Sequence, residues 1–322
     1  MLSRRGLLAP TCGLTLAALA LTGCAGPEGS DGRLSVSASF YPLQFVAQEV
    51  GGDRVDVSSL TPPGAEPHDL ELSPSQVSSL RSADLVVYLS GFQPSVDEAV
   101  ESAGPAHVVD AADATTLVPF SEENVEEVDE HGHEAHAGED EHDHAHDGHD
   151  HGDLDPHFWL DPTLLAPVAQ AVAAQLSELD PDGAAEFEAN AAALASRLGE
   201  LDTAFEEGLA ACERRVFVTT HTAFGYLADR YGLEEVGISG IDPEAEPSPA
   251  RLVEIHDVVE REGVTTIFFE ALVSPKVAQT LATDLGIESA VLDPLEGVSG
   301  SQTYFSVAED NLQALQTALG CS

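Results

Sequence analysis

Residues 181–211 constrain the fold of this chain most, because they have the composition of one long helix. The run is rich in Ala, Leu and Glu, and Asp180-Pro181 supplies an N-cap followed by proline at the first helical position. About 30 helical residues span roughly 45 Å, more than the width of one small domain. We therefore predict a rigid rod that joins two lobes. The alternative is two ordinary helices that meet near Gly199.

Strand-like and helix-like segments alternate on both sides of this helix. The strands that we predict are residues 34–40, 54–60, 84–89, 107–109, 215–220, 235–239, 264–269 and 287–292. Helical segments lie between them, several opened by Ser-Pro and closed by Gly. The pattern predicts an α/β fold of two lobes, each with a mostly parallel sheet flanked by helices. The predicted divisions are an N-terminal lobe at 34–180, the linking helix at 181–211 and a C-terminal lobe at 212–322.

The N-terminus has the features of an export signal. Arg4 and Arg5 precede an apolar run that is too short and too early for a membrane-spanning helix. Leu21-Thr22-Gly23-Cys24 then resembles a bacterial lipobox, which predicts a lipoprotein signal peptide at 1–23, a lipid on Cys24 and a tether at 24–33. The expected location is the outer face of the cytoplasmic membrane. The alternative is a plain secreted protein in which L-T-G-C occurs by chance.

Charge and cysteine content narrow the function further. A formal net charge of -45 excludes a nucleic-acid binder on electrostatic grounds and suits a particle that attracts cations. Once the signal is removed and Cys24 carries lipid, Cys212 and Cys321 remain. In an exported chain this pair predicts a disulfide, and the alternative is two unpaired buried thiols.

The segment at about 121–154 is rich in histidine and acid. It contains eight histidines, which are His131, His133, His136, His142, His144, His146, His149 and His151. Neutral imidazole is a common ligand for Zn(II), Cu(II) and Ni(II), so these side chains predict an auxiliary, geometrically loose metal-binding loop. The segment has too few apolar residues to offset its ordering entropy, so we expect disorder. The alternative is an acidic solubilising linker.

Three further candidate ligand-binding residues directly follow predicted strands. His221, Glu270 and Asp293 each lie just past a strand's carboxyl end, where open α/β sheets bind ligands. His157 lies beside Trp159, the only tryptophan in the chain, directly after the histidine-rich segment. His107 and His256 have no such context, and we expect them to be surface or structural residues.

Six motifs in the same order resemble a known family. They are Ala65-Glu-Pro-His-Asp69, Asp155-Pro-His-Phe-Trp-Leu-Asp161, Thr219-Thr-His-Thr-Ala-Phe-Gly-Tyr226, the D-P-E-A-E-P-S-P stretch at 242–249, Ile267-Phe-Phe-Glu270 and Leu292-Asp-Pro-Leu295. The chain resembles the cluster A-I substrate-binding proteins of bacterial metal ABC transporters, in their zinc-binding, ZnuA-like branch. The likeness runs from about Leu34 to the end of the chain. It implies a metal site in the cleft between two lobes.

The resemblance also implies the ligands. Carried over residue by residue, they are His68, His157, His221 and Asp293, with Glu270 as a partner that orients one imidazole or, alternatively, as a structural carboxylate. Three imidazoles and a carboxylate suit tetrahedral Zn(II). Manganese-binding relatives place Glu where this chain has His221, so His221 favours zinc.

The function that this implies is capture of Zn(II) as cargo and its delivery to an ABC permease by a monomeric, non-enzymatic lipoprotein. The alternative functions are a surface adhesin or metal buffer, manganese uptake, and an exported zinc hydrolase. A hydrolase keeps an open metal position, which a fourth protein ligand would close, and the chain has no H-E-x-x-H motif.

Overall fold

The computed structural model describes residues 32–120 and 154–322, and Arg33–Ser322 form one compact unit. The predicted signal peptide, Cys24 and the eight histidines of the 121–154 segment lie outside the described residues. Within the described residues, no helix is both long and apolar enough to span a bilayer.

The first half of this unit is built on a four-stranded parallel sheet in the order β2-β1-β3-β4. Its strands are β1 (Leu34–Ala38), β2 (Val55–Ser59), β3 (Leu85–Tyr88) and β4 (Val108–Asp110). Its helices are α1 (Tyr41–Gly51), α2 (Pro74–Ser82), α3 (Pro94–Ala103) and the short α4 (Ala111–Ala114). Neighbouring residues of β3 pack into different cores, Val87 with α1 and Val86 with α2 and α3, because strand side chains alternate between faces.

The second half repeats this plan with the order β6-β5-β7-β8. Its strands are β5 (Val216–Thr219), β6 (Glu234–Gly237), β7 (Thr266–Phe269) and β8 (Glu288–Val291). Its helices are α7 (Gly225–Tyr231), α8 (Pro249–Glu262), α9 (Lys276–Leu285) and α10 (Tyr304–Leu319). The predicted α/β class with two mostly parallel sheets is therefore confirmed, and the strand ends differ from the predicted ones by one or two residues in most cases.

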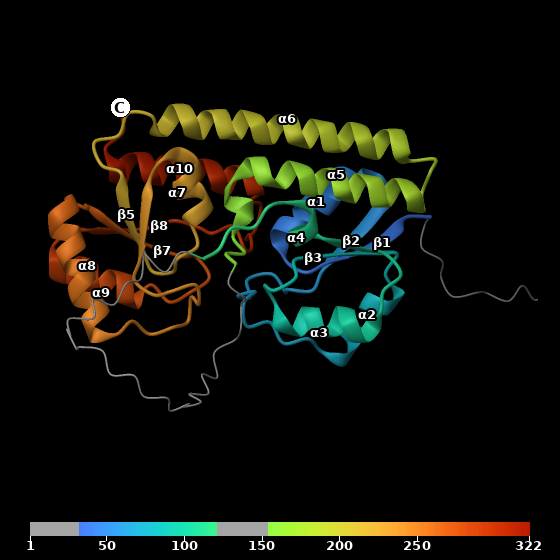
Figure 1. Ribbon diagram of the computed structural model, residues 1–322, viewed down its shortest axis with the longest axis horizontal. Helices are drawn as coiled ribbons and strands as arrows, with labels where there is room; N and C mark the ends of the chain where they lie inside the picture. The colour runs from blue at the N-terminus through green and yellow to red at the C-terminus, as the bar shows by residue number, and fades with distance from the viewer. Residues whose placement is uncertain (1–31, 121–153) are drawn as a thin grey trace, which may run out of the picture. The chain divides into compact units, whose positions relative to one another are not determined.

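Two long helices, α5 (Pro162–Leu179) and α6 (Ala184–Leu209), connect the halves. Figure 1 shows α6 as one rod beside α5, and it contacts α1 in the first half and α7 and α10 in the second. The helix continues through Gly199, so the two-helix alternative is wrong. It begins at Ala184 and not at the predicted Pro181, because residues 181–183 form a turn. One apolar core includes side chains from both halves, and the predicted lobe boundaries stay a prediction.

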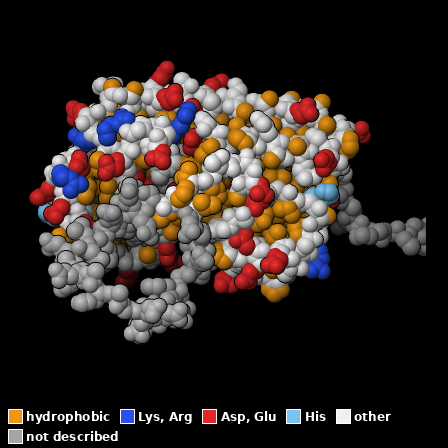
Figure 2. Space-filling view, viewed as in Figure 1, with side chains coloured by type: hydrophobic (Ala, Val, Ile, Leu, Met, Phe, Trp, Pro, Cys, Tyr) orange, Lys and Arg blue, Asp and Glu red, His pale blue; other side chains and the backbone are white. Residues whose placement is uncertain are grey.

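A disulfide between Cys212 and Cys321 joins the segment after α6 to the end of α10, which confirms the predicted pair. Backbone hydrogen bonds from Arg214 to Leu319 and from Ser322 to Ala211 hold the same two segments together. On the face shown in Figure 2, acidic side chains are scattered among apolar ones, with few Lys or Arg.

Candidate metal centre

Four buried side chains from four separate loops meet between the two sheets. They are His68 after β2, His157 before the short 3₁₀ turn η3 (Phe158–Leu160), His221 after β5 and Glu296 after β8. One potential ligand atom from each lies within 4.8 Å of the others. All four side chains are at most 3% exposed. The carboxyl ends of parallel strands bring three of these loops together.

The loop before α2 is held in place by residues of its own half. Gln93 donates from Nε2 to the carbonyl of Pro67 at 3.0 Å and to the Thr61 hydroxyl at 3.1 Å. The Glu66 carboxylate accepts the backbone N–H of His68 at 3.0 Å. These bonds hold the backbone that leads into His68.

Asp155 orients His157. Its Oδ1 atom accepts both the backbone N–H of His157 at 2.9 Å and the ring Nδ1–H at 2.8 Å. A carboxylate only accepts hydrogen bonds, so it holds the proton on Nδ1 and turns Nε2 toward the centre. Tyr226, on α7, donates its hydroxyl to the carbonyl of Asp155 at 2.9 Å and so ties this loop to the second half.

His221 is held in the same way by the predicted partner Glu270. The distance from Nδ1 of His221 to Oε1 of Glu270 is 2.9 Å. Nε2 of His221 is buried and has no hydrogen-bond partner within the described residues, and Nε2 of His157 faces only the Glu296 carboxylate, 3.4 Å away. Buried polar atoms are normally satisfied, so two ring nitrogens facing one space indicate room for a cation.

The predicted fourth ligand, Asp293, is not in this cluster, and Glu296 occupies the place expected for it. Oδ1 of Asp293 instead accepts the backbone N–H of Leu295 at 2.8 Å, and its own backbone bonds to Asn311. Leu295 has a φ of 62°, a left-handed conformation that reverses the chain. That turn directs Asp293 into the loop and brings Glu296, one methylene longer, to the imidazoles.

The carboxylates around the metal-free cluster favour a protonated imidazole within it. Burial lowers the pKa of His68 to about 4, which keeps this imidazole neutral. Burial opposes a charge on His157 as well, but the carboxylate of Asp155, bonded to Nδ1, and that of Glu296, 3.4 Å from Nε2, raise its pKa to about 10. Burial also opposes ionisation of Glu296, whose pKa is nevertheless lowered by the imidazoles of His68 and His157. The metal-free centre therefore holds an ionised carboxylate beside a protonated His157, and, against the opposing effect of burial, the carboxylate of Glu270 also raises the pKa of His221.

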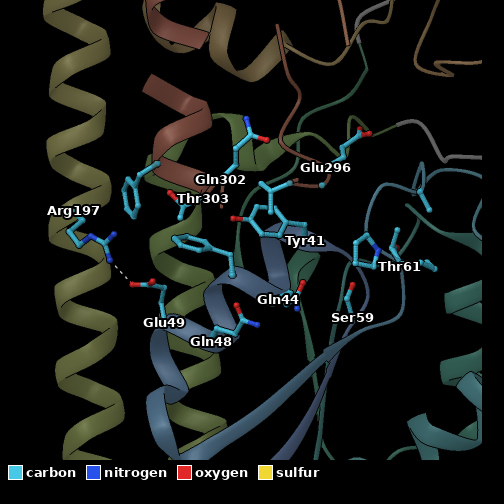
Figure 3. A pocket seen from close by; sticks show the side chains of 17 residues that line it. Tyr41, Gln44, Gln48, Glu49, Ser59, Thr61, Arg197, Glu296, Gln302 and Thr303 are labelled. Carbon is cyan, nitrogen blue, oxygen red and sulfur yellow. Dashed lines mark hydrogen bonds and ion pairs between the residues drawn. The ribbon is translucent and has the colours of Figure 1, made fainter. Parts of the chain in front are cut away.

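Glu296 also borders a cavity of about 460 Å³ and is the only one of the four cluster residues that does. Figure 3 shows this cavity between α1, α6 and the loop that precedes α10, with Glu296 at one end and the Arg197–Glu49 ion pair at the other. Glu296 thus belongs both to the cluster and to the lining of this cavity.

The chemistry of the donor set fits Zn(II). Three imidazole nitrogens and one carboxylate oxygen match its preference for four tetrahedral ligands of this kind. Each orienting bond leaves one ring nitrogen of His157 and of His221 free to face the centre. The remaining histidines lie elsewhere, as expected: His107 is near Gln175, and His256 is half-exposed on α8 beside Asp257.

Two residues that hold the site were missed at the level of sequence. Asp155 is not among the site residues predicted above, although an acid two positions before a candidate histidine is a signal for an orienting partner. Glu235 is 1% exposed and binds the backbone of the loop that carries His221. Burial raises its pKa to about 7. Nothing in the motif around Glu235 distinguishes it from its exposed neighbour Glu234.

The identity of the carboxylate ligand can be tested with two isosteric variants. We expect Glu296→Gln to raise the dissociation constant for Zn(II) by at least about 10- to 100-fold, the range seen when a residue that only orients a ligand is lost. Asp293→Asn should change it less than about threefold, because an amide oxygen can still accept the Leu295 N–H. Competition with a chromogenic chelator measures both. A larger effect of Asp293→Asn would restore the original assignment.

Comparison with known proteins identifies the family. A family model described as zinc-uptake complex component A, periplasmic (ZnuA), matches residues 36–318. The chain belongs to the ZnuA family. Its ZnuA-family relatives include the high-affinity zinc uptake system protein ZnuA of Bacillus subtilis, 36% identical over 318 residues, which cover 96% of this chain and 95% of the relative.

A longer relative is the zinc-binding lipoprotein AdcA of Streptococcus pneumoniae, 36% identical over 311 residues. The match covers 94% of this ZnuA-family chain and 59% of AdcA, so the chain spans little more than half of that relative. The Zn(II)-bound ZnuA-like domain of AdcA has a TM-score of 0.71 at 32% identity, covering 89% of this chain and 99% of the domain. The laminin-binding protein Lmb of Streptococcus agalactiae has a TM-score of 0.74 at 33% identity, with the same coverages.

Proposed function

We propose that this chain is an extracytoplasmic substrate-binding lipoprotein that captures Zn(II) and delivers it to an ABC permease for import. The observation that carries the proposal is the buried cluster of three imidazoles, two of them oriented by carboxylates, and Glu296 in a ZnuA-family fold. Relatives described as zinc-binding or zinc-uptake proteins support zinc as the cargo. The protein would act as a monomer, and the permease and the membrane would be its partners.

The four residues would act as metal ligands. His68, His157 and His221 would each supply a neutral ring nitrogen, and Glu296 would supply one negative charge. Asp155 and Glu270 would hold the Nδ1 protons of His157 and His221 and so raise the basicity of the opposite nitrogens. The site would be closed, because four protein ligands leave no position for a water nucleophile, which argues against a zinc hydrolase.

The location follows from the N-terminus. A lipid on Cys24 would hold the protein at the outer face of the cytoplasmic membrane, and the lipoprotein AdcA supports this location. The histidines between 131 and 151 would collect metal near the permease. Their number and the acidic residues among them would raise the local cation concentration, an effect that salt screens.

A second role as an adhesin is favoured by one specific comparison. Lmb of Streptococcus agalactiae, 33% identical, is described as a bifunctional protein with adhesin and metal transporting activity. Manganese uptake is less consistent with the centre, because Mn(II) favours carboxylate, carbonyl and water ligands, whereas three of these four are imidazoles.

Zinc titration by calorimetry on the mature chain tests the function directly. We expect one tight site, plus weaker binding that disappears when residues 130–151 are deleted, because histidines spread along one stretch of sequence can surround a metal only at a cost in conformational entropy. Growth of a deletion strain under zinc limitation, with and without a complementing copy of the gene, measures the delivery of zinc. Loss of the tight site on deletion of 130–151 would place the primary site in that segment and contradict the proposal.

Zinc affinity should continue to rise as the pH increases from 7 to 9, above the pH range in which an ordinary imidazole titrates. Because the pKa of His157 is raised to about 10, this ring is protonated at neutral pH and must lose its proton to bind zinc. One displaced proton predicts about a tenfold gain in affinity per pH unit between pH 7 and 9. Imidazoles with an ordinary pKa of about 6.5 would give no further gain above pH 7.

Chelator competition at several pH values, with proton release measured by calorimetry in two buffers, provides the readout. Asp155→Asn is the matched control, since it removes one of the two carboxylates that hold the proton on His157. This variant should flatten the pH profile. A flat profile for the unmodified protein above pH 7 would show that the metal-free centre carries no such proton.

A further inference from the structure

The loop that carries His221 runs from the end of β5 to the start of α7 and is clamped by one buried carboxylate. Glu235, on β6, accepts the Thr219 hydroxyl at 2.8 Å, the Ala223 N–H at 3.2 Å and the Phe224 N–H at 2.9 Å. These donors lie on both sides of His221 in sequence. The Ala223 N–H also bonds to the carbonyl of His221 at 3.1 Å, so Glu235 holds the turn at this residue.

The segment that follows β6 contacts the same loop a second time. The Thr222 hydroxyl donates to the carbonyl of Ser239 at 2.9 Å, and the Thr222 N–H donates to the carbonyl of Gly240 at 3.0 Å. A Cβ atom at Gly237 would lie 1.9 Å from the Thr222 hydroxyl and 2.7 Å from the Ser239 carbonyl oxygen. This approach requires glycine, because any other residue would push Thr222, the neighbour of His221, out of place.

We propose that Glu235 and Gly237 are positioning residues, which aim the His221 imidazole so that the centre prefers a tetrahedral ion over an ion that needs six ligands. The inference rests on the proposed zinc-binding function and names two residues that set its selectivity. Neither residue contacts the metal. They act through the backbone of the 219–224 loop, whereas Glu270 acts through the ring.

The physical reason lies in the number and direction of the donors. Zn(II) binds four ligands at about 2.0–2.2 Å, and four rigid side chains can satisfy it fully. Mn(II) prefers six ligands, mostly oxygen, so it needs a site loose enough to admit water. If the His221 loop relaxes, zinc loses a well-aimed ligand, while an ion that accepts water in its place loses less. Loosening this loop should therefore weaken the binding of Zn(II) more than the binding of Mn(II).

Three variants and one control separate this role from general stabilisation. Glu235→Gln places an NH₂ group against one of its N–H donors, and Gly237→Ala introduces the clash with Thr222. Thr219→Val removes only the hydroxyl bond. Val236→Ala is the control: it lies between the two positions on β6, is 7% exposed, and its side chain packs into the core beneath α8 on the other face of the sheet.

The measurements are the dissociation constants for Zn(II) and Mn(II) by chelator competition, and the visible spectrum of the Co(II)-loaded protein. We expect Glu235→Gln and Gly237→Ala to weaken zinc binding about 10- to 100-fold, as for other residues that orient ligands. Manganese affinity should change much less, so the ratio of the two constants should shift at least tenfold, and the strong visible bands of tetrahedral Co(II) should weaken. Thr219→Val should give a smaller shift of the same sign.

Val236→Ala should lower the melting temperature and leave the ratio and the Co(II) spectrum unchanged. The inference is overturned if folded Glu235→Gln keeps the zinc-to-manganese ratio within about threefold of the unmodified protein. It is overturned equally if Val236→Ala shifts the ratio as much, because the effect would then be general destabilisation. Absence of tight zinc binding in the unmodified protein would instead refute the proposed function. If Gly237→Ala does not fold, Glu235→Gln and Thr219→Val decide.

Discussion

His221→Ala should raise the dissociation constant for Zn(II) on the order of 100- to 1000-fold. Structural zinc sites with four protein ligands bind with apparent free energies of about 10–16 kcal/mol, so an equal share for one ligand is about 2.5–4 kcal/mol. The substitution also leaves the buried carboxylate of Glu270 without the ring that it now holds at 2.9 Å. Chelator competition on the mature protein measures the loss.

His107→Ala is the matched control for this ligand. His107 is half-buried, lies outside the cluster, and has its Nδ1 atom 3.4 Å from Nε2 of Gln175. Its removal should leave the zinc affinity within about twofold. A loss comparable to that of His221→Ala would mean that the centre is not the tight site.

Removal of the disulfide should cause the largest change in stability. Cys212 and Cys321 are 109 residues apart, and closing a loop of this length stabilises the folded state by about 4–5 kcal/mol in the chain-entropy model. For a chain of this size, the double variant Cys212→Ser/Cys321→Ser should melt on the order of 10 °C lower. The zinc affinity at 25 °C should change little, because neither cysteine belongs to the metal cluster.

The experiment must be done on the metal-free protein, because bound zinc stabilises the folded state and would mask part of the effect. Chemical unfolding of the oxidised protein, the reduced protein and the double variant supplies the comparison. Reductant should lower the stability of the unmodified protein to that of the variant and have no effect on the variant itself. Equal stability of all three forms would show that the backbone bonds between 211–214 and 319–322 suffice.

Several parts of this structure could be predicted from local sequence patterns. Apolar runs bounded by Gly and Pro predicted two sheets, and they differ from the observed strands mainly at the ends, where pairing partners and not composition set the limits. The long helix predicted to begin at Pro181 begins three residues later, at Ala184. A proline at the first position is compatible with a helix start and with a turn, and here residues 181–183 form the turn.

Three of the four candidate ligands could be predicted from sequence motifs, and the fourth could not. His68, His157 and His221 lie within motifs that the resemblance identified, and the structure brings them together. For the fourth position, the stretch L-D-P-L-E-G contains two carboxylates three residues apart. Which one enters the centre depends on the turn at Leu295 and on the bond from the Trp159 indole to the carbonyl of Pro294, 135 residues away in sequence. No local pattern reports such a contact.

The sequence by itself determined the α/β class, the paired cysteines and the three histidines, because periodicity, residue type and motif order are all local properties of the chain. Only the tertiary structure decided that Glu296 and not Asp293 faces the imidazoles, that Asp155 orients His157, and that Glu235 clamps the loop of His221. Each of these depends on where a side chain from another loop or strand lies. Side-chain direction is set by the backbone turn and by packing against distant residues, which a single sequence does not specify.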